Sequence, residues 1–240
     1  MRLRIYRGKM AAGVKPSLAW GVARLVREPC QKGTSVLPVV AALKAHPDRE
    51  KLVPQRLWKY FDTHLVVSGW YPEQDYFELI EALATTIDPK TSGGDVWRFF
   101  AKFSVRQDLA GTHVTGRAAS KAKGVYRNFA SSIRGNPEQV LIRGVKLWRQ
   151  YHDTGTMRIC GGRLDTNEVL MQLVDFHIPI DGFVRLQGYY LEEFGHLVGV
   201  ELESKVTQST ALGDRMCEWV HTLARTPASE AYVATLPPVR

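Results

Sequence analysis

Residues 157–173 read MRICGGRLDTNEVLMQL, and they decide the fold because the periodicity of the chain changes here. Apolar residues occupy every second position in two parts of this stretch, as strands require: Met157 and Ile159, then Val169, Met171 and Leu173. A helix is expected next, from residue 181 to about residue 197, and alternating segments follow at 198–202 and 217–223. We therefore predict strand, strand, helix, strand, strand over residues 153–225.

Residues 32–152 instead repeat their apolar side chains at the three- and four-residue spacing of helices. Thr34 or Ser35 can cap the first helix, and Pro54 and Pro72 can each open a later one. The helices are expected near 36–44, 54–65, 72–87, 96–105, 125–133 and 140–148. A helical half followed by a ββαββ half predicts an α+β fold, with an antiparallel sheet covered on one face.

The predicted domain organisation follows from this layout. Residues 32–225 should form a single α+β domain, with a helical part at 32–152 and a sheet-containing part at 153–225. Residues 1–31 are predicted to be a basic, loosely ordered arm, and 226–240, with three prolines, a loose C-terminal tail.

The net charge of +8 is unevenly spread over the 240 residues. Residues 1–32 and 109–149 each hold eight basic residues and one acidic residue, whereas 150–240 hold seven basic and twelve acidic ones. The basic segments could bind nucleic acid, an anionic partner, through contacts at Arg117, Lys121, Lys123 and Arg127. Because no base-reading motif accompanies them, we favour pairing of residues 109–149 with the acidic C-terminal half, within one protomer or across a homodimer.

Several functional classes lack their sequence signals. Cys30, Cys160 and Cys217 lie far apart, which disfavours a disulfide framework or a structural zinc site and fits a reducing, cytoplasmic compartment. No apolar run approaches the roughly 18 residues of a membrane span.

The sequence also lacks the common catalytic motifs. G-x-G-x-x-G, G-x-x-x-x-G-K-[ST], H-E-x-x-H and G-x-S-x-G are absent, so we predict no catalytic residue, no metal site and no required cofactor, and an enzyme is disfavoured. Of the seven histidines, His177 and His196 bracket the late helix and His221 lies in the last strand. We interpret such scattered histidines as surface or hydrogen-bonded core residues in preference to ligands.

Four short stretches, in this order, give the chain a family resemblance: KGTSVL at 32–37, SGWYP at 68–72, LWRQYHDTG at 147–155 and LGDRMCEW at 212–219. Together they resemble a family of mostly uncharacterised bacterial proteins that is abundant in myxobacteria. Its C-terminal half is similar to the 4-vinyl-reductase-like and haem-NO-binding-like domains of the NO-signalling and Golgi-transport (TRAPP-like) superfamily. The resemblance covers residues 32–225.

This resemblance implies a small-ligand or protein-interaction module, commonly dimeric, in bacterial signalling. A glycine-acidic turn followed by cysteine, found in the related domains, appears at Gly213, Asp214 and Cys217. The chain lacks the Tyr-x-Ser-x-Arg element of haem NO sensors, so a propionate clamp is not carried over and no proximal histidine is assigned.

Our leading hypothesis is a non-enzymatic regulatory or scaffold protein that forms a homodimer. It would bind a small apolar ligand between its helices and sheet, or a protein partner. The ligand-lining residues expected from the late helix and the last strand are Tyr189, Tyr190, Cys217 and Trp219. A nucleic-acid-associated protein is the first alternative, and a reductase-type enzyme or a haem or metal sensor is the second.

Overall fold

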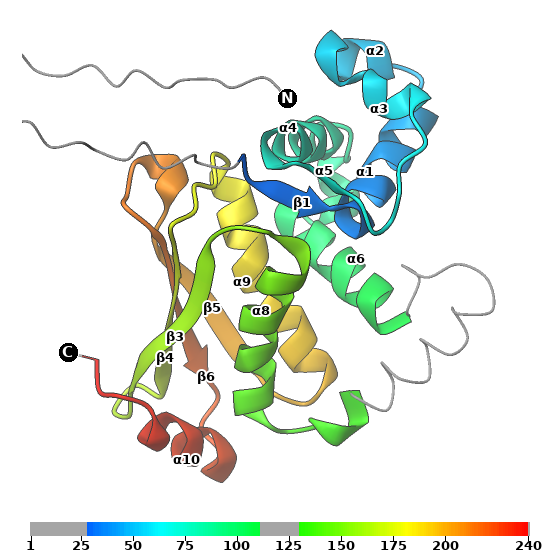
Figure 1. Cartoon of the computed structure of the whole chain (residues 1–240). Coiled ribbons are helices and arrows are strands. Elements are labelled where there is room, and N and C mark those ends of the chain that lie inside the picture. The colour runs from blue at the N-terminus through cyan, green and yellow to red at the C-terminus, as the bar shows by residue number, and fades with distance from the viewer. Residues whose placement is uncertain (1–27, 111–129, 240) are drawn as a thin grey trace, which may run out of the picture.

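The computed structural model describes residues 28–110 and 130–239, which fold into a helical half followed by a sheet half (Figure 1). This is the predicted α+β architecture. The helical half contains α1 (Gly33–Ala45), α2 (Arg49–Leu52), the 3-10 helix η1 (Gln55–Leu57), α3 (Lys59–Asp62), α4 (Glu73–Ala84), α5 (Pro89–Ser92), α6 (Val96–Ala110) and α8 (Pro137–Tyr151). The sheet half contains β3 (Thr156–Arg163), β4 (Glu168–Val174), α9 (Asp181–Leu197), β5 (Leu202–Gln208), the 3-10 helix η2 (Thr210–Leu212), β6 (Cys217–Leu223) and α10 (Pro227–Thr235).

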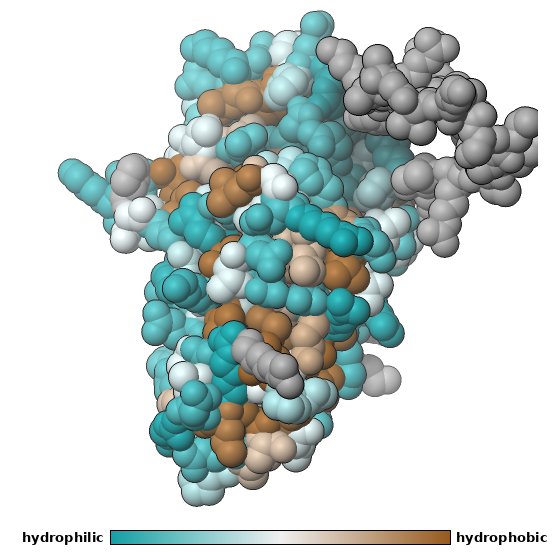
Figure 2. Space-filling model, turned by 90° about the vertical axis from the view of Figure 1, so that its left-hand side faces the viewer, coloured by the Kyte–Doolittle hydropathy of each residue, from teal (hydrophilic) through white to brown (hydrophobic). Residues whose placement is uncertain are grey.

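The four long strands form one antiparallel sheet in the order β3-β4-β6-β5, which confirms the predicted antiparallel ββαββ half. Met171 pairs with Trp219, and both are buried on the inner face, which α8 and α9 cover (Figure 1). The next pair along these strands, Leu170 and Val220, points to the outer face. Figure 2 views the molecule from this side and shows hydrophobic residues gathered between hydrophilic ones.

A single hydrophobic core joins the two halves. The ring of Phe183, in the first turn of α9, packs edge-on against Tyr76 and Phe77 of α4, with ring centroids 6.0 and 5.0 Å away. Next to it, Gly182 lies so close to the indole of Trp97 in α6 that a Cβ atom at this position would overlap the ring. The start of α9 is therefore one of the places where the helical half packs against the sheet half.

The structure corrects two predicted elements. The helix expected at 54–65 is broken into η1 and α3 and ends at Asp62. Lys44 Nζ donates to the Phe61 carbonyl (2.6 Å), one of the carbonyls left without an intrahelical partner at this end. The strand expected at 198–202 begins only at Leu202, since the Gly195 carbonyl accepts hydrogen bonds from the amides of Val198 and Val200 and closes the end of α9.

The predicted loose ends also need correction. The basic arm cannot extend to residue 31, because β1 (Cys30–Lys32) pairs antiparallel with β2 (Trp70–Pro72) and fixes the start of α1. Helix α1 begins at Gly33, ahead of the predicted caps Thr34 and Ser35. Residues 1–27 lie outside the described residues.

The C-terminal tail is not loose. A capping box between Thr226 and Ser229, with Pro227 in the first turn, starts helix α10. Tyr232 and Val233 of this helix are buried in the common core. The residues after 225 thus belong to the folded domain.

Candidate ligand cavity

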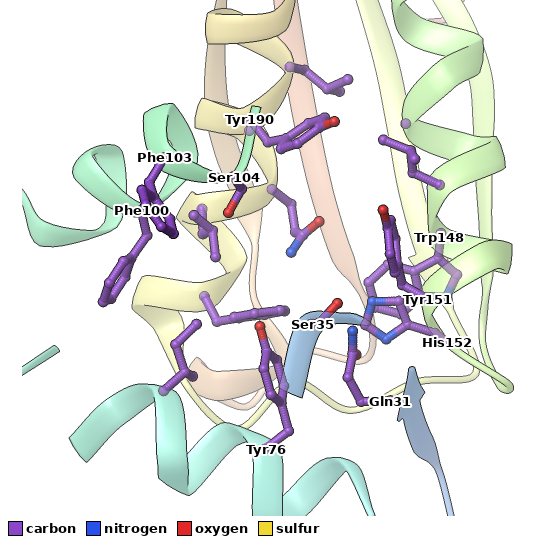
Figure 3. Close-up of a pocket in the computed structure, with 18 of the residues that line it drawn as sticks. Gln31, Ser35, Tyr76, Phe100, Phe103, Ser104, Trp148, Tyr151, His152 and Tyr190 are labelled. Atoms are coloured by element: carbon purple, nitrogen blue, oxygen red, sulfur yellow. The ribbon is translucent and has the colours of Figure 1, made fainter. Parts of the chain in front are cut away.

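A cavity of about 210 Å³ lies between α1, α4, α6, α8, α9 and the inner face of the sheet (Figure 3). The cavity is partly open to solvent, and Phe103 in its lining is 49% exposed. Protein cores are normally packed as densely as organic crystals, so a space of this size beside the core is unusual. It is larger than the roughly 150 Å³ cavity that can hold benzene and smaller than the roughly 300–1,000 Å³ pockets of drug-sized ligands. Its size therefore suits one small molecule.

The wall of the cavity is mostly aromatic and aliphatic. Figure 3 shows Tyr76, Phe100, Trp148 and Tyr190 around it, each from a different helix. The aromatic lining residues are Tyr76, Phe100, Phe103, Trp148, Tyr151, Phe183, Tyr190 and Trp219. Among the described residues, the lining contains no Lys, Arg, Asp or Glu, so the cavity offers no fixed charge to a ligand.

Polar groups enter the cavity from β1 and the start of α1. Gln31 is 2% exposed, and neither its Oε1 nor the Oγ1 of Thr34 has a hydrogen-bond partner among the described residues. Figure 3 places Gln31 and Ser35 near His152 on this side. Both oxygens are buried, and leaving a buried polar oxygen unpaired costs roughly 1–3 kcal/mol.

His152 is held in place at the end of α8. Its ring lies flat on the indole of Trp148, and its Nδ1 is 2.7 Å from Oε1 of Glu73, the first residue of α4. Both members of this pair are buried. The contact ties the cavity wall made by α8 to the wall made by α4.

His221 lines the cavity from β6 and is 1% exposed. Its Nδ1 is 2.9 Å from Oγ of Ser204 on the neighbouring strand, and that hydroxyl donates to the carbonyl of Gly188 in α9 (3.1 Å). The other ring nitrogen, Nε2, has no partner among the described residues. Burial lowers the pKa of His221 to about 4, so the ring is neutral at pH 7.

Of the four residues predicted to line a ligand site, two line the cavity and two lie outside its lining. Tyr190 and Trp219 line the cavity, and the indole of Trp219 donates to the Val184 carbonyl (2.9 Å). Tyr189 is not among the lining residues, and its ring lies 4.2 Å from the guanidinium of Arg98. Cys217 is buried and also outside the lining; its Sγ lies 3.2 Å from Oγ1 of Thr210, and burial raises the pKa of the thiol.

The predicted anionic-partner residues, Arg117, Lys121, Lys123 and Arg127, lie outside the described residues. In the part of the chain that the structure describes, no helix is long and apolar enough to cross a membrane. Within the same ranges, His, Cys, Asp and Glu do not gather in a group of three or more that could hold a metal ion.

The sequence pattern does not predict that Gln31, His152 and His221 line a cavity. Gln31 falls within the predicted arm, and its strand of three residues is too short to show a periodicity. His221 sits at an inward position of an alternating strand, a signal that shows burial only. Its open nitrogen depends on Ser204 and Gly188, which only the folded chain brings together.

Comparison with known proteins gives structural neighbours only. No family model and no curated protein matches the chain. Among solved structures, an H-NOX protein from S. oneidensis in the Fe(II)NO ligation state is 14% identical, aligned over 81% of this chain and 99% of that chain, with a TM-score of 0.45. The Fe(II) unliganded H-NOX protein from K. algicida is 11% identical over 82% and 98% of the two chains, with a TM-score of 0.44.

The cavity does not fit a haem. A tetrapyrrole is as bulky as the ligands of the larger pockets above, whereas this space is about 210 Å³. His152 and His221 are the two lining histidines. The ring of His152 is stacked on Trp148 and its Nδ1 contacts Glu73, and Nε2 of His221 is buried, so neither histidine presents a nitrogen to the centre of a macrocycle.

Proposed function

We propose that the chain is a non-enzymatic regulatory domain that binds one small, uncharged and mostly apolar molecule in the cavity between its helices and its sheet. The observation that carries the proposal is a partly open cavity of about 210 Å³ beside the core, lined by aromatic residues from several helices and by the sheet. A space of this kind is stable and useful when a ligand fills it, because apolar contacts replace empty volume.

Binding would act on the whole fold. The cavity touches α1, α4, α6, α8 and α9, so a ligand that fills it makes contacts with both halves at once. A ligand that binds only the folded chain stabilises it in proportion to its concentration. We propose that this stabilisation changes the interaction of the chain with a protein partner or with a second copy in a homodimer. Light scattering of the full chain tests whether the homodimer forms.

The cavity proposal is tested by titrating the full chain with 2-methylnaphthalene in a calorimeter. Ser104 lines the cavity from α6 (Figure 3), so Ser104→Phe should place a ring in the space, whereas Ser104→Ala removes only a hydroxyl. We expect saturable binding of one molecule per chain in the wild type and in Ser104→Ala, and at least tenfold weaker binding in Ser104→Phe. Equal binding in all three proteins, or no saturable binding in the wild type, would overturn the proposal.

A further inference from the structure

We propose that the chain docks on anionic lipid membranes through an apolar tip, residues 66–70, together with the basic side chains of residues 1–27. The tip follows α3 and ends at the first residue of β2, in the helical half. Docking of this kind places apolar side chains at the boundary between lipid head groups and acyl chains, without crossing the bilayer. It does not depend on the cavity or on its ligand.

The tip is a cluster of exposed apolar side chains. Among the described residues, seven large hydrophobic side chains are exposed, and three of them belong to the tip. Val66 is 50% exposed, Val67 42% and Trp70 39%. The other four lie at separate places in the sequence, and single exposed apolar residues are ordinary on protein surfaces. Three within five residues instead indicate a place where an apolar partner binds.

The turn inside the tip does not require apolar residues. The amide of Gly69 donates to the carbonyl of Val66 (2.9 Å), so Val67 and Ser68 occupy the two central positions of a turn. Gly, Pro, Asn, Asp and Ser are the residues that favour such positions. The need to form the turn therefore does not explain the two exposed valines.

The tip is held in one shape by its neighbours. The hydroxyl of Tyr71 accepts from the amide of Val66 (2.7 Å) and donates to the carbonyl of the same residue (3.3 Å). The amide of Gly33, the first residue of α1, donates to the carbonyl of Gly69 (2.9 Å). A tip that is already ordered loses little conformational entropy when it binds.

The charges near the tip suit a negatively charged surface. Residues 63–72, which contain the tip and β2, include no acidic residue, and neither do residues 29–47, which contain β1 and α1. Lys32 pairs with Trp70 across the two strands and places its Nζ 4.4 Å from the centre of the indole ring. Tryptophan is enriched at membrane–water interfaces, and the amine of a neighbouring lysine attracts anionic head groups.

The basic arm is joined to the chain close to the tip. Residues 1–27 hold seven basic residues and no acidic one. Five residues separate Arg27 from Lys32, the partner of Trp70, and five extended residues span at most roughly 17 Å. The arm is therefore tethered beside the tip. Each Lys or Arg near an anionic leaflet strengthens binding about fivefold.

A bilayer uses this combination better than nucleic acid or a protein does. Contacts to nucleic-acid phosphates come from basic and polar side chains, and exposed valines add nothing to them. A stable protein interface takes roughly 20–30 residues on each side, far more than the tip offers. A membrane needs no matching shape, and an apolar insertion and a basic segment are two weak signals that together hold a protein on its surface.

The test measures co-sedimentation of the full chain with lipid vesicles at about 0.1 M salt. The vesicles contain phosphatidylcholine alone, or phosphatidylcholine with about 30% phosphatidylserine. Val66→Ser/Val67→Ser removes the apolar side chains of the turn. Leu164→Ser/Leu212→Ser is the matched control, because these leucines are 53% and 75% exposed and lie in the sheet half. Thermal unfolding checks that each variant is folded.

We expect the wild type to bind the phosphatidylserine vesicles at least tenfold more tightly than phosphatidylcholine alone. Val66→Ser/Val67→Ser should bind them about tenfold less tightly than the wild type, and the leucine control should bind like the wild type. Replacement of Arg2, Arg4, Arg7 and Lys9 by Gln should weaken binding at least twentyfold, because it removes four of the seven basic residues of the arm.

Insertion of the tip itself is measured at Trp70. Lipids with brominated acyl chains quench the fluorescence of tryptophan only at short range. Trp70→Phe keeps an aromatic ring beside Lys32, so it should still bind the vesicles, but the quenched part of the fluorescence should be smaller than in the wild type. Equal quenching in the two proteins would show that the tip does not enter the bilayer.

Three other results would also overturn the proposal. The first is a wild type that binds random duplex DNA and neither kind of vesicle, since the basic residues would then serve nucleic acid. The second is a Val66→Ser/Val67→Ser variant that binds vesicles as tightly as the wild type or the leucine control. The third is a dimer, seen by light scattering, that this variant dissociates while the wild type ignores vesicles, because the tip would then contact a second copy of the chain.

Discussion

The imidazole of His152 lies parallel to the indole of Trp148, with the ring centroids 3.5 Å apart and the planes inclined by 2°. The stack forms one wall of the cavity and is anchored by the hydrogen bond from His152 to Glu73. His152→Phe should keep an aromatic ring against Trp148 but leave Oε1 of Glu73 buried without its partner. We expect the free energy of unfolding in urea to fall by about 2 kcal/mol.

Glu73→Gln is the matched control for this pair, because an amide can still hydrogen-bond to Nδ1 of His152. Glu73→Gln should lower the free energy of unfolding by less than half as much as His152→Phe. Equal losses in both variants would show that the hydrogen bond is not what anchors the wall.

The start of α9 gives a second prediction. Gly182 packs against the ring of Trp97, and a methyl group there would overlap the indole, which is buried and cannot move freely. Gly182→Ala should lower the free energy of unfolding by about 3 kcal/mol through overpacking. Urea denaturation measures the loss, and a change below about 0.5 kcal/mol would contradict the close packing of the two halves.

The capping box of α10 gives a third prediction. Thr226→Ala removes the side-chain oxygen that accepts from the Ser229 amide, so about 1 kcal/mol of stability should be lost. Because Tyr232 and Val233 belong to the core, deletion of residues 226–240 should cost several times more. A truncated protein as stable as the full chain would restore the interpretation of these residues as a loose tail.

The free energy of unfolding should depend on pH through the protonation of His221. In the unfolded chain its imidazole takes up a proton near pH 6.5, whereas burial in the folded chain lowers its pKa to about 4. Between these two values the unfolded state binds more protons, so the free energy of unfolding falls as the pH decreases, by about 3 kcal/mol in total. His221→Gln, which lacks this group, should lose correspondingly less stability between pH 6.5 and pH 4, and parallel curves would contradict the assignment.

The sequence predicts the parts of the fold that are periodic. Alternation at Val169, Met171 and Leu173 identifies β4, and the stripe that includes Phe183 and Phe194 identifies α9. Their periodicity follows from burial on one face, which is a local property. The two strands of the β1–β2 sheet are only three residues long each, too short to show such a pattern, so the sequence does not predict them.

The site is harder to predict because the hydrogen bonds of its polar atoms depend on residues in other elements. The alternation of β6 predicts that Trp219 and His221 lie on the inner face. It does not predict that the indole of Trp219 finds a hydrogen-bond partner whereas Nε2 of His221 has none among the described residues. Those depend on Val184, Ser204 and Gly188, which lie in other elements. A cavity beside the core likewise depends on the packing of several helices at once.

The most direct measurement is a crystal structure of the full chain grown with 2-naphthol. We predict one naphthol ring in the cavity beside Trp219 and Tyr190. A structure in which protein side chains fill the cavity, or in which the naphthol binds elsewhere on the chain, would contradict the account.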